Sequence, residues 1–333
     1  MADTQRTSSA GASVAVLGAA GYAGAVAAGL LHRHPGFNLA HVTARSDAGT
    51  RLDAVHPRTR VPLELEAYDP GMQVDAAVVA YPHGAAAPVV EELVERGVRV
   101  VDLSADFRLH ELSTYTEWYG DHPAPGLIGR AVYGLPELHR EQIRDAALVA
   151  NPGCYPTAAI LALAPLARAG LLGDVVIDAK SGVSGAGREP SHGKHFVSVD
   201  ETVTPYKVGR HRHTPEIEQE LGGGVMITFT PHLVPLSYGE LVSCYVTPAR
   251  AVDAAALYRD AYAGEPWVEV VEGPPGMQEV RETNFCRISV HGDERTGKLI
   301  VFATIDNLYK GTSSQAVQNL NLMFGLDESE GLA

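Results

Sequence analysis

A single cysteine stands where a tight turn leads into an apolar run. The turn reads Asn151-Pro152-Gly153-Cys154-Tyr155-Pro156-Thr157, and residues 158–163 are all apolar. Because Pro156 suits the first turn of a helix, we expect a helix to begin near Cys154. Unpaired N–H groups and the helix dipole at such a start stabilise a thiolate and lower the thiol pKa toward neutrality. The segment is typical of a reactive cysteine, although a small buried thiol in a core would have the same local sequence.

Two histidines stand directly before a second expected helix. Residues 211–216 read His-Arg-His-Thr-Pro-Glu, in which Thr214 is the expected N-cap and the proline and glutamate fall in the first turn. A histidine held there within reach of Cys154 would form the thiolate and imidazolium pair that attacks acyl groups. His211 and His213 would also share one face of an extended segment, as metal ligands do. No third ligand of suitable spacing follows, so we expect a positioned base and no metal.

A loop of small residues follows the predicted strand 174–180. It reads Ser181-Gly182-Val183-Ser184-Gly185-Ala186-Gly187 and lies between Lys180 and Arg188. Such a loop can hold a phosphate or carboxylate group with its N–H groups and hydroxyls, and a flexible hairpin would have the same composition.

The elements that must position these groups begin with a strand, a turn and a helix. Ser13–Leu17 is a short apolar run, Gly18-Ala19-Ala20-Gly21-Tyr22-Ala23-Gly24 follows, and a helical stretch runs to His34. Glycines at such a turn let the backbone approach a pyrophosphate, and the helix start supplies N–H donors. The spacing is G-x-x-G-x-x-G rather than G-x-G-x-x-G, so close packing of the helix on a sheet would also explain it.

Further strands at 37–43, 76–80 and 98–103, with a helical pattern at 85–96, predict a parallel, doubly wound sheet. The second of the four strands ends near Arg45 and Ser46, and no acid stands at the strand end to bind a ribose 2′-OH. Because Arg45 can pair with a 2′-phosphate, this end favours NADP(H) over NAD(H). The loop containing Pro82-His83-Gly84 follows the third strand, at the edge where such sheets bind ligands.

The second half predicts a mixed or antiparallel sheet from strands at 226–230, 241–246 and 298–303. The amphipathic stretch 313–324 is expected to form a helix that folds back onto the first half. A chain of 333 residues exceeds the usual span of one core, so we expect two domains. We place a nucleotide-binding domain at 1–152, completed by 313–333, and a catalytic and oligomerisation domain at 153–312.

The amino-acid composition disfavours some classes of binding partner and some cellular locations. Lys and Arg number 26 against 40 Asp and Glu, and the net charge of −14 disfavours nucleic acid and anionic membranes because basic residues do not cluster. The three cysteines form no C-x-x-C pair, which favours a reducing cytoplasm. The N-terminus has no signal pattern, and the apolar stretch 14–31 is broken by four glycines, so no membrane span is expected.

Taken together, these segments closely resemble the family of N-acetyl-gamma-glutamyl-phosphate reductases from about residue 13 to the C-terminus. The matching segments are Gly18–Gly24, Pro82–Gly84, Asp102–Arg108, Tyr133–Glu137, Asn151–Thr157, His211–Ile217 and Asp306–Gly311. The resemblance implies an α/β fold in which a Rossmann-type doubly wound parallel sheet is joined to an α+β domain like the catalytic domain of glyceraldehyde-3-phosphate dehydrogenase. It also implies NADPH-dependent reductive dephosphorylation of N-acetyl-glutamyl 5-phosphate to the semialdehyde, a step of arginine biosynthesis, with release of inorganic phosphate, in a homotetramer.

The resemblance also implies the site residues. Cys154 would attack the acyl phosphate and carry a thioester, with His213 as first choice for the acid and base that handles the thiol and hemiacetal protons, and His211 sharing that task or binding substrate. The residues expected to bind cofactor are Gly18, Ala20, Gly21, Tyr22, Gly24, Arg45, Ser46, Pro82, His83, Gly84 and Asn307. The residues expected to bind substrate are Asn151, Lys180, Ser181, Gly182, Ser184 and Glu216.

Three positions depart from the usual family pattern. Tyr238 stands where the family commonly has arginine, Arg287 where many relatives have an acid, and Ser313-Ser314 where smaller residues are usual. A related acyl-phosphate reductase, acting on a carrier-linked or homologated glutamyl group, is therefore the closest alternative. A non-catalytic NADP-binding sensor would not need Cys154 with the histidine pair, and a cysteine hydrolase or acyltransferase would not need the nucleotide-binding sheet.

Overall fold

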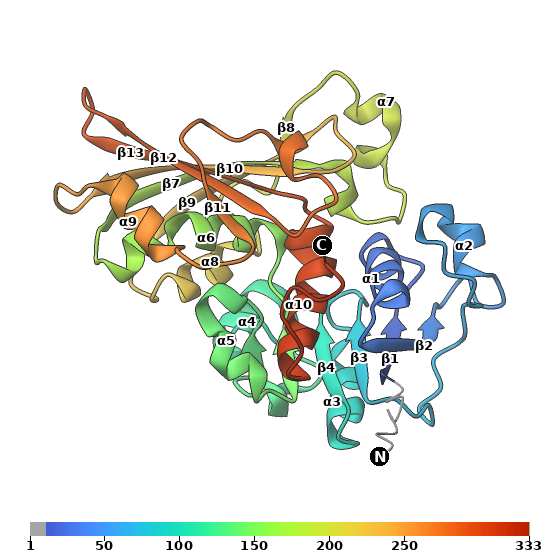
Figure 1. Cartoon of the computed structure of the whole chain (residues 1–333). Helices are drawn as coiled ribbons and strands as arrows, with labels where there is room; N and C mark the ends of the chain where they lie inside the picture. Colours follow the sequence, from blue (N-terminus) through green and yellow to red (C-terminus); the bar gives the residue numbers. More distant parts are fainter. Residues whose placement is uncertain (1–10, 333) are drawn as a thin grey trace, which may run out of the picture.

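The computed structural model describes residues 11–332, which form two sheets and the helices packed on them (Figure 1). The first sheet has six strands in the order β2-β1-β3-β4-β6-β5, and all neighbouring pairs are parallel. Its strands are β1 (Ala12–Leu17), β2 (Phe37–Thr43), β3 (Ala76–Val79), β4 (Arg99–Asp102), β5 (Val132–Tyr133) and β6 (Leu148–Ala150). The predicted doubly wound parallel sheet is confirmed.

The strands of this sheet are apolar because both faces of its centre are covered. All four residues of β3 are buried, as are Val14 to Leu17 of β1. Strand β1 has β2 on one side and β3 on the other, so the chain reverses its direction of travel at β1. The carboxyl ends of these strands therefore frame the crevice in which doubly wound sheets bind ligands. The helices of this half are α1 (Tyr22–Arg33), α2 (Leu52–Val55), α3 (Ala87–Glu95), α4 (Leu112–Tyr119) and α5 (Pro136–Arg144).

The second sheet has seven strands in the order β11-β12-β13-β10-β7-β9-β8 and is mixed, as expected. The pairs β7 with β9 and β11 with β12 are parallel, and the others are antiparallel. Its strands are β7 (Leu172–Gly182), β8 (Thr204–Pro205), β9 (Ile227–Val234), β10 (Glu240–Pro248), β11 (Val268–Val270), β12 (Cys286–Asp293) and β13 (Lys298–Ile305). The accompanying helices are α6 (Cys154–Arg168), α7 (Phe196–Val199), α8 (Thr214–Glu220) and α9 (Ala254–Ala261).

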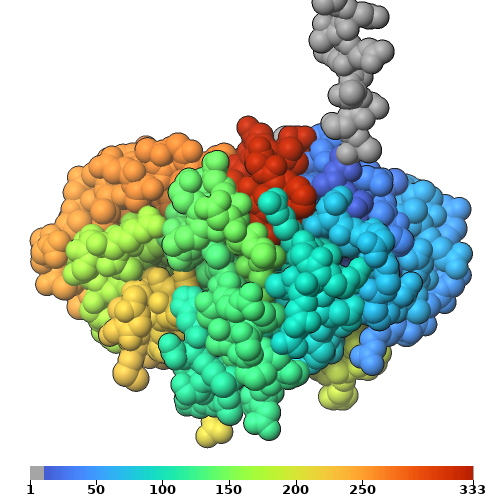
Figure 2. All heavy atoms as spheres, turned by 90° about the horizontal axis from the view of Figure 1, so that it is seen from below, coloured from blue at the N-terminus to red at the C-terminus, as the bar shows by residue number. Residues whose placement is uncertain are grey.

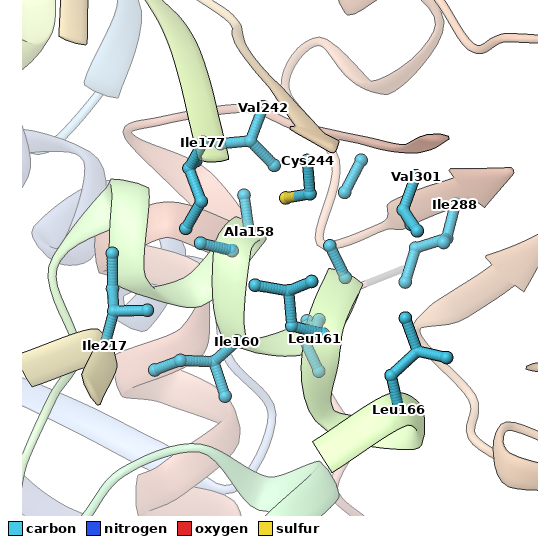
Figure 3. Close-up of a cluster of buried hydrophobic side chains, with 14 of the residues drawn as sticks. Ala158, Ile160, Leu161, Leu166, Ile177, Ile217, Val242, Cys244, Ile288 and Val301 are labelled. Carbon is cyan, nitrogen blue, oxygen red and sulfur yellow. The ribbon is translucent and has the colours of Figure 1, made fainter. Parts of the chain in front are cut away.

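Helix α6 is the centre of the second core. Every residue from Tyr155 to Leu166 is buried, so this helix is apolar around its whole circumference rather than on one stripe. Figure 3 shows Leu161 and Ala158 of α6 facing strand side chains that include Ile177 and Cys244. Cys244 is fully buried there, and burial raises its pKa, so it has the role of a small apolar residue.

The C-terminal helix α10 (Ser314–Met323) returns to the first half, as predicted for the stretch 313–324. Ala316, Val317 and Leu320 are fully buried in the same core as β1 and α1. In the space-filling view the C-terminal segment lies between the blue and the green to orange parts of the chain (Figure 2). The helix is thus packed into the centre of the molecule although it comes last in the sequence.

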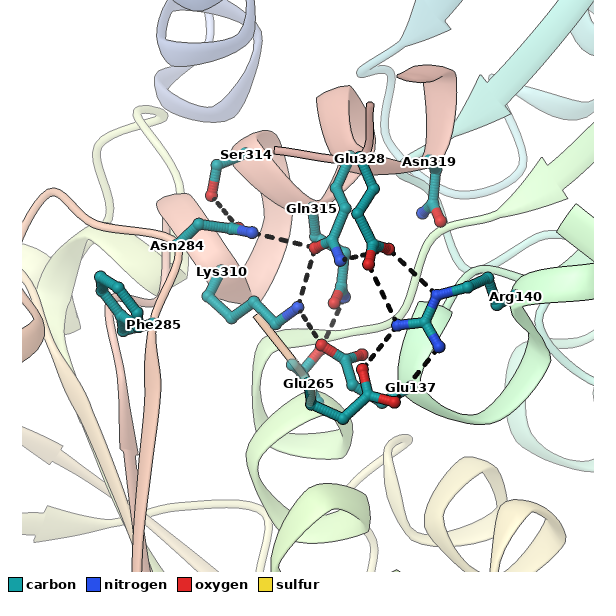
Figure 4. A network of polar contacts seen from close by, with 12 residues as sticks. Glu137, Arg140, Glu265, Asn284, Phe285, Lys310, Ser314, Gln315, Asn319 and Glu328 are labelled. Carbon is teal, nitrogen blue, oxygen red and sulfur yellow. Dashed lines mark hydrogen bonds and ion pairs between the residues drawn. The ribbon is translucent and has the colours of Figure 1, made fainter. Parts of the chain in front are cut away.

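Buried polar side chains connect α10 to the rest of the chain (Figure 4). Lys310 Nζ, fully buried, donates to Glu137 Oε1 of α5 at 2.6 Å and to Gln318 Oε1 of α10 at 2.9 Å. Arg140 of α5 donates to Glu265 and to Glu328, which follows α10. The network therefore joins α5, α10 and the loop before β11.

Local details differ from the sequence-based expectations. Helix α8 begins at Thr214 with His213 as N-cap, so Thr214 is the first helical residue and not the cap, and no side chain caps the helix. The expected loop after β7 is a 3₁₀ turn, Val183–Ala186, after the strand has continued to Gly182. Shifts of one or two residues are usual at the ends of helices and strands. Among residues 11–332, no helix has the length and apolar character needed to cross a membrane.

Candidate active site

Cys154 is the first residue of α6, as predicted, and it lines a cleft of about 700 Å³ between the two halves. Strand β6 leads into the turn, and the N-cap, Gly153, has an extended conformation with φ −69° and ψ 158°. The thiol does not have the lowered pKa that its helix start led us to expect. Burial and the nearby Glu240 raise the pKa of Cys154 well above its usual value and outweigh the Tyr155 N–H and Arg108, which lower it.

Two buried charged side chains, Glu216 and Arg108, hold the Cys154 turn in place. Glu216 of α8 accepts a hydrogen bond from the Gly153 N–H at 2.9 Å and another from the Tyr133 hydroxyl at 2.8 Å. Arg108 lies 3.5 Å from Glu216 and donates to the Asn151 carbonyl at 2.8 Å. Charged groups with several partners hold a backbone segment in one position.

Both histidines lie in the same cleft as Cys154. The ring centroids of His211 and His213 are 4.7 Å apart, and the backbone N–H of His213 donates to His211 Nδ1 at 3.2 Å. A Cβ on Gly153 would lie 2.5 Å from His213 Nε2, so the ring lies directly against the turn that carries Cys154. His213 Nδ1 is buried without a hydrogen-bond partner.

The histidines are neutral bases. Burial lowers the pKa of His213 well below its usual value, and His211 and Arg108 lower it further. Burial, with Lys207 and Arg212 nearby, lowers the pKa of His211 to about 4. Among the described residues, 11–332, no group of three or more His, Cys, Asp and Glu side chains is arranged to hold a metal ion.

The residues expected to bind substrate divide into two groups. Ser181 and Gly182 line the cleft, and the Ser184 hydroxyl accepts a hydrogen bond from Asn307 at 2.9 Å beside it. Lys180 does not line the cleft, because its Nζ pairs with Asp178 at 2.6 Å.

The other two expected substrate ligands are occupied by the protein itself. Asn151 is fully buried, donates to the Thr312 carbonyl at 3.0 Å and accepts from Asn319 at 3.0 Å. Glu216, as described, holds the Gly153 N–H and is 1% exposed. Both side chains therefore act on the Cys154 turn from inside the protein.

Several residues of the cleft were missed at the sequence level. Arg108 lines the cleft, and so do Lys194, Lys207 and Ser104. The Asp102–Arg108 segment is one of the matching family segments, so Ser104 and Arg108 could have been proposed from it. Lys194 lies in a segment without a recognisable motif, and only the folded chain brings it to the cleft.

The nucleotide-binding turn has the geometry that a dinucleotide requires. Gly18 has φ +86°, a left-handed conformation that favours glycine, and a Cβ on Gly24 would collide with the Gly18 carbonyl oxygen. Gly21 is the N-cap of α1, and the first N–H groups of the helix, from Tyr22 onward, have no partner within it. The Gly21 N–H donates to the Gly18 carbonyl at 3.1 Å, whereas the N–H groups of Ala20 and Tyr22 are available to a pyrophosphate.

The remaining residues expected to bind cofactor lie at the carboxyl edge of the first sheet or beside it. Arg45 is exposed, and Ser46 donates to Asp47 at 3.0 Å. Pro82 and His83 line the cleft.

Two of these expected ligands bond within the protein. The Gly84 N–H donates to Asp106 at 2.7 Å. Asn307 is 1% exposed and accepts a hydrogen bond from the Gly239 N–H at 2.8 Å, so its side chain supports the loop of Ser184.

Comparison with known proteins matches both halves of the chain. The family model described as semialdehyde dehydrogenase, NAD binding domain, matches residues 13–146, and the model described as semialdehyde dehydrogenase, dimerisation domain, matches residues 154–307. N-acetyl-gamma-glutamyl-phosphate reductase of Desulforudis audaxviator is 49% identical, covering 96% of this chain and 97% of the relative. The enzyme of the same name from Moorella thermoacetica is 48% identical, covering 95% and 96%.

Solved structures match in fold. Aspartate semialdehyde dehydrogenase II from Vibrio cholerae superposes with a TM-score of 0.74 at 19% identity, covering 95% of this chain and 99% of that one. Aspartate semialdehyde dehydrogenase with NADP from Candida albicans gives a TM-score of 0.73 at 14% identity, with the same coverage. At these identities the likeness concerns the fold alone.

Proposed function

The chain belongs to the N-acetyl-gamma-glutamyl-phosphate reductase family, and we propose that Cys154 carries the acyl group in its reaction. The protein is an NADP-dependent oxidoreductase that converts N-acetyl-glutamyl 5-phosphate into N-acetyl-glutamate 5-semialdehyde in arginine biosynthesis. The observation that supports Cys154 most strongly is its place at the start of α6 in a cleft shared with both histidines.

In the first half of the reaction, Cys154 Sγ forms a bond to the acyl carbon and the bond from that carbon to the phosphate oxygen breaks. Phosphate leaves with the electron pair, and a thioester remains on Cys154. The N–H groups at the start of α6 face the developing oxyanion, because the first N–H groups of a helix have no partner within it.

In the second half, NADPH supplies a hydride to the thioester carbon when it is bound. His213 handles the proton of the hemiacetal oxygen. In the direction of semialdehyde oxidation, neutral His213 accepts this proton, and in the direction of synthesis the same group returns it. The place of the ring directly against the Cys154 turn, in the same cleft, supports this role. The His211 ring accepts a hydrogen bond from the backbone N–H of His213, which holds the backbone of His213 beside it.

Substrate anions are bound by cations of the cleft and by the turn after β7. Arg108, Lys194 and Lys207 are cleft residues of positive charge, and Ser181 and Gly182 at the end of β7 line the same cleft. We propose that Asn151 and Glu216 hold the Cys154 turn in position. Lys180 has no role in substrate binding in this proposal.

The proposed cofactor site combines three parts of the first sheet. Ala20, Gly21 and Tyr22 at the start of α1 bind the pyrophosphate, with Gly18 and Gly24 allowing the close approach. Arg45 and Ser46 bind the 2′-phosphate. Pro82 and His83 of the cleft lie beside the reactive end of the cofactor, and the N–H of Gly84 fixes their loop to Asp106.

The three departures from the family pattern lie outside the cleft. Tyr238 lines a second cavity of about 420 Å³, Arg287 pairs with Glu269 at 2.8 Å, and Ser314 donates to Asn284 at 2.6 Å. None of them lines the Cys154 cleft. These positions therefore give no support to a carrier-linked or homologated substrate.

To test this function, the purified protein is mixed with NADP⁺, N-acetyl-glutamate semialdehyde and phosphate, and the reduction of NADP⁺ is measured by absorbance. We expect turnover that requires both, and loss of at least about 1,000-fold in the Cys154→Ser variant, because the hydroxyl is a much weaker nucleophile. Turnover only with a homologated semialdehyde would keep the reaction and replace the substrate. Normal turnover by the folded Cys154→Ser variant would contradict the proposal that a thioester forms on Cys154.

We further propose that four copies of the chain assemble and that the enzyme works in the cytoplasm. The matching dimerisation model and the exposed apolar side chains Phe196, Val197 and Met226 support assembly, and three free cysteines support a reducing compartment. Light scattering of the purified protein tests the first point by giving the mass of the assembly. We also propose a domain division at 152/153 with the first domain completed by α10, since the two sheets lie on either side of that boundary.

A further inference from the structure

The cleft that contains Cys154 is positively charged although the chain as a whole is acidic. The net charge of the chain is −14, with 40 Asp and Glu against 26 Lys and Arg. Among the described residues that line the cleft there is no Asp or Glu, and the cations are Arg108, Lys194, Lys207 and Arg212. A cleft lined by one sign of charge concentrates ligands of the opposite sign. The cleft therefore favours an anion, and its four cations differ in how free they are to bind one.

Two of the four cations already donate to protein groups. Arg108 Nε donates to the Asn151 carbonyl at 2.8 Å, and Arg108 Nη1 lies 3.5 Å from the buried Glu216. Lys194 Nζ donates to the Glu189 carbonyl at 2.9 Å. The charge of Arg108 is thus compensated by a carboxylate, and one donor of Lys194 is used within its own segment.

Arg212 is held across the cleft by two neutral side chains of the first half. Its Nη1 donates to His83 Nε2 at 2.7 Å, and its guanidinium carbon lies 5.0 Å from the centre of the Tyr119 ring. Since an arginine can only donate, His83 is the acceptor and its ring is neutral. The face of a tyrosine ring attracts a cation without neutralising it. The guanidinium is therefore fixed in place and keeps its full charge.

One edge of the Arg212 guanidinium is free. Within residues 11–332 its Nε and Nη2 donate no hydrogen bond, and no carboxylate lies within ion-pair distance of it. The N–H groups of this edge are parallel and match two oxygens of a carboxylate or phosphate group. Lys207 is exposed, and its single ammonium group has no fixed contact in the described part of the chain. Arg212 is thus the cleft cation that is both fixed and uncompensated.

We propose that Arg212 determines specificity by binding an oxyanion of the substrate through two hydrogen bonds, from Nε and Nη2. The proposal rests on the proposed function, because the acyl-phosphate substrate carries two groups of this kind, a phosphate and an α-carboxylate. Both present pairs of oxygens that can accept from one guanidinium edge. The experiment below distinguishes between these two groups.

An oxyanion on Arg212 also changes the neighbouring histidines. Arg212 stands between His211 and His213 in the chain. Burial lowers the pKa of both rings, and the charge of Arg212 lowers it further. An anion bound to Arg212 offsets this charge, so that a proton on His213 costs less free energy once the substrate is present. Substrate binding and the proton transfer proposed for His213 are thereby coupled.

The test measures by calorimetry how the full-length protein with NADP⁺ bound takes up two unreactive probes, inorganic phosphate and N-acetyl-glutamine. NADP⁺ fills the proposed 2′-phosphate site, so inorganic phosphate does not bind there. N-acetyl-glutamine carries the α-carboxylate and has a neutral amide in place of the acyl phosphate. We expect Arg212→Gln to weaken the binding of one probe at least about tenfold and to leave the other nearly unchanged, because one guanidinium edge binds one oxyanion. The probe that is lost identifies the group that Arg212 binds.

Arg210→Gln is the matched control. Arg210 is exposed, does not line the cleft and belongs to the same segment, so this variant removes the same charge without removing the ligand. Equal weakening in Arg210→Gln and Arg212→Gln would reveal a long-range effect of charge and would overturn the proposal. It is also overturned if wild type binds neither probe, if Arg212→Gln binds both probes normally, or if it loses both to the same extent.

Arg212→Lys separates the paired hydrogen bonds from the charge. Lysine keeps the charge but lacks the two parallel donors, so the affinity for the identified probe should lie between those of wild type and Arg212→Gln. Wild-type affinity in Arg212→Lys would show that charge alone suffices and would overturn the two-bond arrangement. The melting temperature of each variant checks that it is folded.

Turnover separates this proposal from the proposed function. The KM for the reactant that carries the identified group, phosphate or semialdehyde, should rise at least about tenfold in Arg212→Gln, with little change in the KM for NADP⁺. A rise in the KM for NADP⁺ alone would contradict a substrate ligand. Failure of wild type to reduce NADP⁺ with every semialdehyde, with probe binding still dependent on Arg212, would contradict the proposed function and leave the oxyanion site standing.

Discussion

At the scale of the residue, two influences act on Cys154 in opposite directions. The helix start and Arg108 stabilise the thiolate, while burial and Glu240 stabilise the thiol, and the second pair dominates. The resting enzyme therefore holds a neutral sulfur beside a neutral His213. A thiol that is protonated at rest is also protected from oxidation, since the thiolate is the form that oxidants attack.

Gly153 tests how closely the histidine must approach the cysteine. Its φ of −69° suits any residue, but a Cβ would lie 2.5 Å from His213 Nε2 and 2.9 Å from Arg108 Nη1. We expect Gly153→Ala to lower kcat by about 100-fold by displacing both groups, with little change in melting temperature. The matched control is Gly224→Ala, where a Cβ meets nothing within 4 Å, and wild-type kcat in Gly153→Ala would contradict the arrangement.

The buried His211 predicts a dependence of stability on pH. Its pKa is about 4 in the folded protein and 6.5 when unperturbed, so between these values the unfolded chain binds a proton that the folded protein does not. The stabilisation is present above pH 6.5 and is lost as the pH falls toward 4, by at most about 3 kcal/mol.

Urea unfolding at several pH values in wild type and His211→Gln measures this contribution. The variant cannot titrate at this position, so its free energy of unfolding should fall less steeply below pH 6.5. Equal slopes in the two proteins would show that His211 does not contribute.

At the scale of the element, polar side chains position the helices that carry the site. Glu216 fixes the start of α8 to the Gly153 N–H, and so to the start of α6. Lys310 ties the turn before α10 to α5 through Glu137, with both side chains buried. The position of each helix start therefore depends on an ion that is itself enclosed by other elements.

Removing one partner of the Lys310 and Glu137 pair should be costly. We expect Lys310→Met to lower the free energy of unfolding by about 3–5 kcal/mol, because it leaves Glu137 charged and unpaired in the core. The double variant Lys310→Met with Glu137→Met should recover much of the loss, since both charges are then gone. Thermal and urea unfolding check both variants, and additive losses would show that the pair is not coupled.

At the scale of the whole molecule, the cleft exists only because the two halves meet. Arg188, after β7, reaches across to the first half, where it pairs with Asp47 at 2.9 Å and donates to the Ala20 carbonyl at 3.3 Å. It thereby neutralises an acid that stands beside the Arg45 and Ser46 proposed for the 2′-phosphate.

Arg188→Ala should therefore weaken NADPH binding more than NADH binding. Asp47, left without its partner, would repel the 2′-phosphate, and we expect the KM for NADPH to rise about tenfold with a smaller change for NADH. The melting temperature should change little, because the pair is partly exposed. Arg295→Ala, which removes an exposed arginine, is the control, and equal effects on both cofactors would contradict this role.

Much of the fold could be predicted because its signals are local. The turn from Gly18 to Gly24, the alternation of strands and helices, and the helix start at Cys154 each depend on neighbouring residues, and the structure has them at the expected places. The end of β7 and the cap of α8 were each misplaced slightly, since tertiary contacts decide how far a strand or helix continues.

The sequence by itself determined that a cysteine stands at a helix start, that two histidines precede another, and that a nucleotide-binding sheet comes first. Tertiary structure alone decided what surrounds them. It placed Glu240 beside Cys154, enclosed Asn151, Glu216 and Asn307 with internal partners, and turned the expected fall in the thiol pKa into a rise. The physical reason is that burial and long-range contacts set the cost of each charge, and neither can be read from neighbours along the chain.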